Sequence, residues 1–433
     1  MMNTQLVVPL SNLMDIKHGY PFSSRYFVDR PTEYILLTPG NFTKDRGLFF
    51  GPNTTYYDGP VSDEFILKDG DLLMVMTDLT KDMAILGNTA ILSPNRLGKQ
   101  VLHNQRIGKV IHKGRCANPM FLMYLLNSHA VRKEIKTTAT GTTVRHTSPN
   151  KILNIKVWAP EIFEQEEIAN ILSKWDRAVS LMERLITANQ QRREGLVQRL
   201  LSGKLRIMDY QYPCSWERCC SPVRSRNSGP CPVDWDYPCL GEIARPITER
   251  NKDNGGGDKK QLPVLSCTKH KGLVDSSSYF SKQIFGKDLS LYKVVRRGRF
   301  AYATNHLEEG SIGYQELYDE ALVSPMYTVF ETLDRVLDKF LYLVLKTNRY
   351  RHIFAVNTNA SVNRRGSLRW KEFARIRVPL PPKEEQEILI RVFSTVDREI
   401  ALLRKQQLAL WQQKQGLMQK LLSGEWRVPV SGK

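Results

Sequence analysis

The sequence predicts an α+β protein in which two mixed α/β domains are separated by two long helices that form an antiparallel coiled coil. The main observation is an internal repeat, because residues 160–207 and 381–428 align without a gap at an offset of 221 positions. Both copies carry Glu-Gln-Glu near their start and Leu-Leu-Ser-Gly near their end. A repeat unit this long describes two similar halves of one chain, each a globular part followed by a helix, and not a solenoid.

The apolar residues of the repeat predict the two helices and their pairing. Steps of four and three alternate along both copies, as is typical of a coiled coil. The residues concerned are Ile168, Leu172, Trp175, Val179, Met182, Ile186, Leu196 and Leu200, and then Leu389, Phe393, Val396, Ile400, Leu403, Leu410, Leu417 and Leu421. Asn189 and Arg193 interrupt the first stripe, and we expect them to fix the register at some cost in stability. The alternative is that each helix packs only on its own domain.

Gly203 and Gly424 complete the Leu-Leu-Ser-Gly motifs and stand where a glycine commonly ends a helix. We therefore place the boundaries of the chain as follows: a first domain at 1–159, a first helix at 160–207, a linker at 208–234, a second domain at 235–380 and a second helix at 381–428.

Short apolar runs between turn signals predict the strands of the first domain. We expect strands at 34–37, 71–76 and 84–86, with glycine- and asparagine-containing turns between them. A helix is predicted over 120–128, because Asn118-Pro119 is a typical helix start. This mixture of strands and a helix indicates an α/β domain.

The second domain repeats the layout of the first. Residues 297–299 (Arg-Gly-Arg) correspond to residues 69–71 (Asp-Gly-Asp) at an offset of 228 positions, and an apolar strand follows each turn. In the second domain that strand is 300–303, and a helix at 340–345 corresponds to 121–126. The likeness is in layout more than in residues, so we expect a shared scaffold with different loops.

Composition points to a polyanionic partner. The net charge of +19 makes nucleic acid the first candidate, although a protein that is merely basic is the alternative. The chain has no apolar stretch long enough for a membrane span and no basic-then-apolar start typical of a signal peptide. These features favour a cytoplasmic protein.

Five of the seven cysteines crowd into residues 214–239 with the spacing C-x4-C-C-x10-C-x7-C. A zinc site is the alternative to plain thiols, and Cys267 and His270 could add ligands. Zinc ribbons, however, use C-x2-C pairs, and none occurs here. The spacing favours free thiols in a linker and a domain edge, and hence no metal.

The sequence carries no recognisable catalytic motif. A phosphate-binding G-x-x-x-x-G-K-[ST] loop is absent, and so is the Asn-Pro-Pro-aromatic run of adenine methyltransferases. The segment Glu134-Ile135-Lys136 matches part of a nuclease element, but a tripeptide is nearly uninformative. We therefore expect no catalytic residue in this chain.

The order of these parts resembles the DNA specificity subunits of type I restriction-modification systems. Each half has a variable domain and then a helix that starts at Glu-Gln-Glu and ends at Leu-Leu-Ser-Gly, and residues 378–382 and 141–143 are also similar to that family. The first copy departs slightly, because Val157-Trp158-Ala159-Pro160 stands where the family has a proline pair.

The resemblance implies a noncatalytic subunit with two target-recognition domains, each of which reads one half of a split double-stranded DNA site. It implies two helices that set the spacing of the half-sites and dock two modification subunits. Those subunits bind S-adenosylmethionine and methylate adenine, and restriction subunits that use ATP and Mg join them. No cofactor is then expected in this chain. The alternatives are a self-contained restriction or modification enzyme, which the missing motifs disfavour, and a stand-alone DNA-binding regulator.

Directional donors and acceptors on loops are the candidate DNA contacts, because base reading needs them. In the first domain the candidates are Thr77, Thr80, Lys81, Thr142, Thr143, Arg145 and His146. In the second domain they are Asn305, His306, Ser361, Asn363, Arg364 and Arg365. Arg296 and Arg297 are expected to contact phosphates or to be plain surface charge. For every one of these residues the alternative is a solvated loop.

Overall fold

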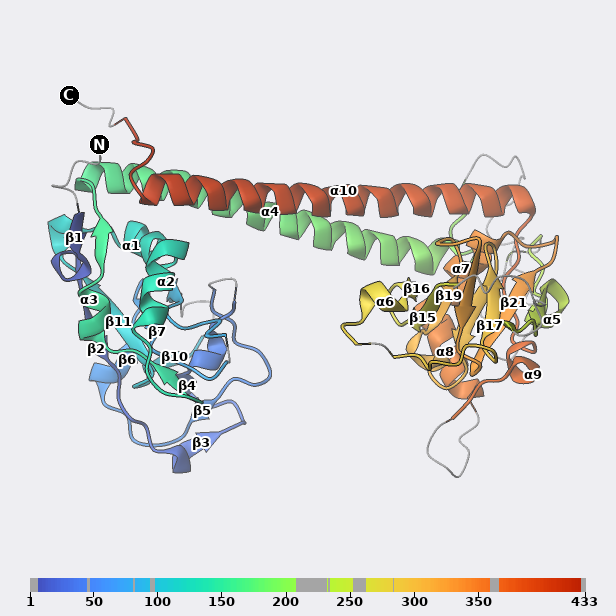
Figure 1. Cartoon of the computed structure of the whole chain (residues 1–433), viewed down its shortest axis with the longest axis horizontal. Helices are drawn as coiled ribbons and strands as arrows, with labels where there is room; N and C mark the ends of the chain where they lie inside the picture. The colour runs from blue at the N-terminus through green and yellow to red at the C-terminus, as the bar shows by residue number, and fades with distance from the viewer. Residues whose placement is uncertain are drawn as a thin grey trace. The chain divides into compact units, whose positions relative to one another are not determined.

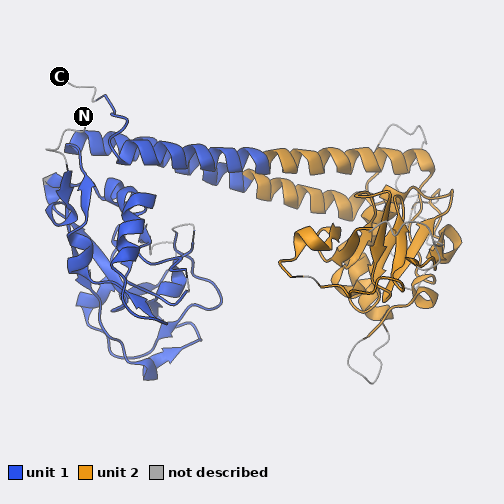
Figure 2. Cartoon of the chain, viewed as in Figure 1, with its two compact units in different colours: residues 1–184, 404–433 blue, residues 185–403 orange. Residues whose placement is uncertain are grey.

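The computed structural model describes residues 7–44, 47–80, 82–93, 98–207, 232, 234–251, 262–282, 284–358 and 366–429. The chain divides into two compact units, coloured separately in Figure 2: unit 1 is 1–184 with 404–433, and unit 2 is 185–403. Each unit combines one sheet-containing domain with the start of one long helix and the end of the other. No helix within the described ranges is long and apolar enough to cross a membrane.

Unit 1 contains several small sheets (Figure 1). A five-stranded sheet has the order β3-β5-β4-β10-β6, a four-stranded sheet has the order β2-β11-β7-β9, and β1-β13 and β12-β8 are two-stranded. The strands are β1 Val7–Pro9, β2 Met14–His18, β3 Phe27–Val28, β4 Tyr34–Leu37, β5 Tyr56–Tyr57, β6 Ile66–Leu67, β7 Leu72–Val75, β8 Thr77–Asp78, β9 Thr89–Ile91, β10 Gln100–His103, β11 Ile107–His112, β12 Arg145–His146 and β13 Lys156–Trp158. All pairs are antiparallel except β4 with β10.

Three helices of unit 1 pack against these sheets: α1 Pro119–Leu126, α2 His129–Thr137 and α3 Pro149–Leu153. Asn118 and Ser128 cap α1 and α2, since their side chains accept hydrogen bonds from the backbone amides of Phe121 and Val131. The largest core of the unit joins α1 to the long helices, because Phe121 packs in the same buried cluster as Leu172 and Leu421.

Unit 2 contains two four-stranded sheets, with the orders β14-β21-β18-β19 and β16-β15-β20-β17. The strands are β14 Ala244–Ile247, β15 Val264–Thr268, β16 Gly272–Asp275, β17 Lys293–Arg296, β18 Phe300–Ala303, β19 Ile312–Tyr314, β20 Glu320–Val323 and β21 Tyr327–Thr332. Its short helices are α5 Leu240–Ile243, α6 Ser276–Tyr279, α7 Asp338–Leu345, α8 Asn348–Asn357 and α9 Trp370–Phe373. Stacked aromatic rings of Phe300 and Phe330, 4.7 Å apart, fill the centre of its core.

The two long helices are α4 Ile162–Leu200 and α10 Lys383–Leu422, which lie within the predicted segments. Their apolar residues enter the domain cores at both ends: Ile168 and Met418 in unit 1, and Leu200 and Phe393 in unit 2. The alternative that each helix packs only on its own domain is therefore wrong, since α4 and α10 share the buried cluster of each unit. Gly203 and Gly424 follow the helices with φ of 73° and 74°, which confirms the predicted glycine caps.

Ion pairs show that the helices run antiparallel within each unit. In unit 1, Lys414 pairs with Asp176 and Arg427 pairs with Glu164, so the α10 end follows α4 in the opposite direction. In unit 2, Arg193 donates from Nη2 to the Asp397 carboxylate at 3.0 Å, as predicted for a residue that fixes register. The other predicted interruption acts differently, because buried Asn189 donates to the Leu185 carbonyl of its own helix.

The Glu-Gln-Glu motif holds the start of each helix. Buried Glu164 accepts two hydrogen bonds from the Arg427 guanidinium, at 2.8 and 2.7 Å, and buried Glu385 accepts two from Arg206, at 3.1 and 2.6 Å. The glutamines also act alike, since Gln165 donates to the Pro160 carbonyl at 2.8 Å; Gln386 donates to the Pro381 carbonyl at the same distance. The Glu-Gln-Glu motif therefore has a structural role at the start of both long helices.

The prediction of a strand at 84–86 is wrong. These residues form turns, because the backbone amides of Ile85 and Leu86 bind the side chain of Asp78 and not a neighbouring strand. The linker predicted at 208–234 lies almost entirely outside the described residues.

Candidate nucleic-acid interface

Two segments predicted to contact DNA lie side by side in unit 1. Strand β8 pairs antiparallel with β12, so that Thr77 lies opposite His146 and Asp78 lies opposite Arg145. These segments are far apart in the sequence, and the structure joins them into a two-stranded ribbon. His146 is exposed, and Thr77 and Arg145 are partly exposed, so the ribbon is accessible to a ligand.

A tight hairpin extends this ribbon. Thr140 and His146 exchange two backbone hydrogen bonds, of 2.9 and 3.0 Å, and Thr142 and Thr143 are exposed at the tip. Gly141 makes the hairpin possible, because its φ is 97° and an added Cβ would lie 2.1 Å from the Val144 carbonyl oxygen. The predicted contacts Thr142 and Thr143 are thus held on a turn that only glycine fits.

Asp78 organises the loop that follows β8, and the sequence analysis did not single it out. Its fully buried carboxylate accepts hydrogen bonds from the amides of Thr80 and Ile85, both at 2.7 Å, and of Leu86 at 2.9 Å. Burial alone would raise the pKa of the Asp78 carboxyl, but these hydrogen bonds outweigh it and hold that pKa below its usual range. The carboxylate therefore stays ionised and fixes the loop.

Helix α2 holds the same loop from the other side. Arg132 donates to the carbonyl oxygens of Ala84 and Leu86, both at 3.0 Å, and Lys136 donates to that of Asp82 at 3.2 Å. The hydroxyl of Thr80, a predicted contact, accepts from the Ala84 amide at 2.8 Å and so helps to shape the loop. The loop is preorganised by its own chain, which lowers the entropy cost of binding a ligand.

Unit 2 brings its candidates to the equivalent place. Asn305 and His306 follow β18, as Thr77 follows β7, and the Leu368 amide donates to the Thr304 carbonyl at 2.9 Å. In unit 1 the Thr147 amide donates to the Met76 carbonyl at 3.1 Å, so both units join the end of a central strand to the segment before the helix. The other candidates lie outside the described residues: Lys81, Ser361, Asn363, Arg364 and Arg365.

The two arginines expected to be phosphate contacts or surface charge are engaged in ion pairs. Arg296 binds Glu249 and Glu320, at 2.7 and 2.9 Å, and Arg297 binds Asp319 at 2.9 Å. These partners offset part of the positive charge of both arginines, whose side chains remain partly exposed.

Few described residues are arranged as metal ligands. His306, Glu308 and Glu309 are the only described group of three whose ligand atoms lie within 4.8 Å of one another, and exposed groups of this kind are common without an ion. Among the cysteines, burial raises the pKa of the Cys267 thiol to about 12. The crowded cysteines at 214–231 lie outside the described residues.

Both halves of the chain are similar to a known protein family. The family model for the type I restriction modification DNA specificity domain matches residues 6–188 and 232–411. The two matches cover one domain and the start of one long helix each.

The chain belongs to this DNA specificity family. It is a DNA-sequence-recognition subunit of a type I restriction-modification system.

Relatives and solved structures agree with this membership. The chain is 22% identical over 379 residues to the type I restriction enzyme MjaVIII specificity subunit of Methanocaldococcus jannaschii, covering 84% of this chain and 81% of that protein. It is similar to the crystal structure of the type I restriction-modification S subunit from M. genitalium, with a TM-score of 0.51, 15% identity and 98% of each chain covered. A second structure, from a type I system studied for its assembly and conformational transition, gives a TM-score of 0.52 at 15% identity and covers 97% of this chain and 98% of its own. At this identity the structures support the fold alone.

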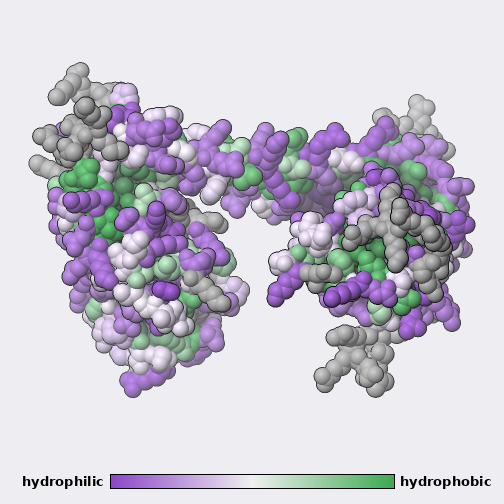
Figure 3. Space-filling view, viewed as in Figure 1, coloured by the Kyte–Doolittle hydropathy of each residue, from purple (hydrophilic) through white to green (hydrophobic). Residues whose placement is uncertain are grey.

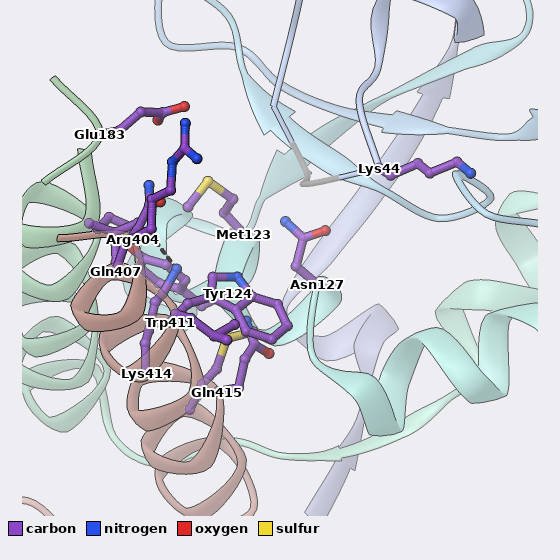
Figure 4. A pocket seen from close by; sticks show the side chains of 14 residues that line it. Lys44, Met123, Tyr124, Asn127, Glu183, Arg404, Gln407, Trp411, Lys414 and Gln415 are labelled. Carbon is purple, nitrogen blue, oxygen red and sulfur yellow. Dashed lines mark hydrogen bonds and ion pairs between the residues drawn. The ribbon is translucent and has the colours of Figure 1, made fainter. Parts of the chain in front are cut away.

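The specificity family's repeated helices carry a second candidate surface. In unit 1 an open cleft of about 460 Å³ lies between α1, α4 and α10 (Figure 4). Tyr124 donates to Asp176 at 2.6 Å, Lys414 pairs with the same carboxylate, and Trp411 and Arg404 lie nearby on α10. The cleft combines an exposed aromatic ring with charged groups, as protein interfaces often do.

Unit 2 has a cleft at the equivalent place, of about 310 Å³. Arg193 and Val197 line it where Lys414 and Met418 line the first cleft, each pair separated by the repeat offset of 221. The rest of its lining differs, because Lys346 and Arg349 make it more basic. The two clefts are therefore equivalent in position and unequal in chemistry.

The long helices also expose apolar side chains. The face in Figure 3 is largely hydrophilic, and apolar patches interrupt it along the helices. Leu181, Leu408 and Trp411 are exposed in unit 1, and Leu185 and Leu402 are exposed in unit 2. Leu408 and Trp411 also line the unit 1 cleft, so exposed apolar side chains adjoin its charged groups.

Proposed function

We propose that each unit reads one half of a split double-stranded DNA site. The observation that carries this is the matched placement of the candidate contacts: in both units they follow a central strand and adjoin the segment that leads to a long helix. Thr77 follows β7 and lies opposite His146 in unit 1, and Asn305 and His306 follow β18 in unit 2. Membership of the DNA specificity family and the net charge of +19 support a DNA ligand.

The chain itself is proposed to be noncatalytic. S-adenosylmethionine, ATP and Mg would be bound by the partner subunits, and this chain would supply recognition and position. The lack of a methyltransferase or nucleotide-binding motif in the sequence supports this division of labour.

The helices are proposed to dock two modification subunits, one in each unit, with restriction subunits joining the assembly. The equivalent clefts lined by Lys414 in unit 1 and Arg193 in unit 2 support two docking sites. The pairs Asp176–Lys414 and Asp397–Arg193 support a helix pair of fixed register, which a spacing device between half-sites requires.

Adenine methylation mapped across the host genome, with and without the gene for this chain, tests the proposal. We expect methylation to disappear at one motif made of two short halves around a fixed gap. Capture of a methyltransferase with the tagged chain separates a silent system from a wrong assignment. A captured methyltransferase whose methylation does not depend on this chain would contradict the proposal.

A further inference from the structure

The β8–β12 ribbon of unit 1 has an apolar tip. Asp78 pairs with Arg145 and Thr77 pairs with His146, so the residues that follow in the same register are Leu79 and Val144. Leu79 is 63% exposed and Val144 is 38% exposed. Two exposed aliphatic residues thus stand at the open end of one antiparallel pair.

The tip continues one face of the ribbon. Side chains alternate along a strand, and the side chain of Asp78 is fully buried, so Thr77 and Leu79 belong to the opposite, outer face. Directly paired residues share a face, which places His146 there, and the alternation of side chains places Val144, two residues before His146, on the same side. The outer face therefore presents a threonine and a histidine followed by two aliphatic side chains.

Leu79 and Val144 are exposed on backbone that other contacts hold in place. A single exposed leucine needs no explanation. Here, however, the buried carboxylate of Asp78 accepts a hydrogen bond from the amide of Thr80, directly after Leu79, and Gly141 shapes the hairpin that carries Val144. Two aliphatic side chains are therefore held in contact with water, and burying them against a ligand would be favourable.

We infer that this ribbon enters the DNA major groove and that Leu79 and Val144 contact the 5-methyl group of a thymine. The inference rests on the proposed function. The major groove is wide enough for a two-stranded ribbon, and the thymine methyl is the apolar feature that a base edge presents there. Thr77 and His146 on the same face supply the hydrogen-bonding groups beside it. Leu79 and Val144 are specificity-determining residues for the half-site of unit 1.

Deoxyuridine scanning tests the inference. The full chain in complex with its modification subunits is bound to duplexes in which each thymine of the methylated motif is replaced, one at a time, by deoxyuridine. Wild-type protein is expected to lose about fourfold in affinity at a thymine of one half-site, the fold-change that burial of one methyl group supports. Leu79→Ala and Val144→Ala are expected to bind the thymine duplex more weakly and to be much less sensitive to deoxyuridine at that position.

Ile111→Ala is the matched control, because Ile111 is an exposed aliphatic residue of the same unit on β11. It should keep both the wild-type affinity and the wild-type deoxyuridine response, and all variants should melt as wild type does. Sequence-specific binding with no deoxyuridine effect in wild type would overturn the inference, as would variants that stay fully sensitive. If the wild-type complex shows no sequence-specific binding at all, the proposed function itself is contradicted.

Discussion

Glu164 in unit 1 and Glu385 in unit 2 are equivalent residues of the repeat, and each pairs with the arginine that follows the opposite helix. The third hydrogen-bond partner of the glutamate differs between the two units. Glu164 also accepts a hydrogen bond from the Val428 amide at 3.1 Å, whereas Glu385 accepts one from the Trp235 indole at 2.9 Å. The same charge pair is therefore completed by backbone in one unit and by an aromatic side chain in the other.

The domains differ far more than the helix ends. Unit 1 has a five-stranded sheet and a β8–β12 ribbon, whereas the described part of unit 2 has two four-stranded sheets. The comparison teaches that the two units are most alike where residues hold the long helices and least alike in the sheets and loops of their domains. Under the proposed function this is expected, because two half-sites of different sequence need different reading surfaces on one scaffold.

The largest effect is expected from breaking the buried glutamate–arginine pair that both units share. Glu385→Ala should lower the free energy of unfolding by about 3 kcal/mol, because it leaves Arg206 and the Trp235 indole without their buried partner. Urea denaturation measures the change. Glu387→Ala is the matched control, since Glu387 belongs to the same motif and is exposed. Equal losses from the two variants would show that the buried pair does not hold the helix start.

The next effect concerns the Gly141 hairpin of unit 1. Gly141→Ala should cost about 2 kcal/mol of local stability, because alanine at a φ of 97° is strained and its Cβ meets the Val144 carbonyl. We expect weaker binding to the specific site in a competition assay. Gly70→Ala is the control, because it has a similar φ of 84° but open space around the Cβ. If both variants bind DNA as wild type does, the hairpin takes no part in recognition.

The pH dependence of stability tests the Glu164–Arg427 pair of unit 1. The hydrogen bonds from Arg427, and then that from Val428, hold the pKa of the Glu164 carboxyl below its usual range despite burial. A depressed pKa contributes stability above the unfolded value, and this contribution is lost as the pH falls through the folded value.

Glu164→Gln should therefore destabilise the protein by about 1.5 kcal/mol at pH 7. The difference from wild type should shrink as the pH falls below about 4.3, where the unfolded carboxyl is protonated. Urea denaturation at pH 7 and at acid pH measures it. A difference that does not change with pH would contradict the role of the ionised carboxylate.

The smallest effect should be equal in the two units. Gly195 and Gly416 are equivalent residues within α4 and α10, and no atom lies within 4 Å of a Cβ added to either. Gly195→Ala and Gly416→Ala should each raise the free energy of unfolding by about 0.8 kcal/mol, because alanine favours a helix interior. Thermal unfolding measures the gain. A loss at either position would mean that the free chain needs glycine there.

Much of the scaffold is predictable from sequence because local patterns encode it. The stripe from Ile168 to Leu200 predicts α4, and apolar runs predict β4, β7, β18 and α7. The arginines of the helix-end pairs also carried a signal, since Arg206 and Arg427 are separated by the repeat offset. Their pairing with the glutamates at the opposite helix starts could have been inferred from an antiparallel arrangement.

The candidate site depends on contacts that no local pattern reveals. Asp78 looks like any loop aspartate until the fold buries it among the amides of residues 80–86, and this burial turned a predicted strand into a clamped loop. The pairing of Thr77 with His146 joins segments that are distant in the sequence. Local sequence patterns pointed to residues on these loops, and they do not reveal which of those residues share a face.

The central claim, that each unit reads its own half of a split site, is tested most directly by changing the reading face of unit 1 alone. Genome-wide adenine methylation would be mapped in cells that carry wild-type protein or the double variant Leu79→Ala, Val144→Ala. The account predicts a two-part motif in which the variant relaxes sequence preference in one half, while the other half and the gap stay unchanged. A contiguous motif, or a variant that alters both halves equally, would contradict it.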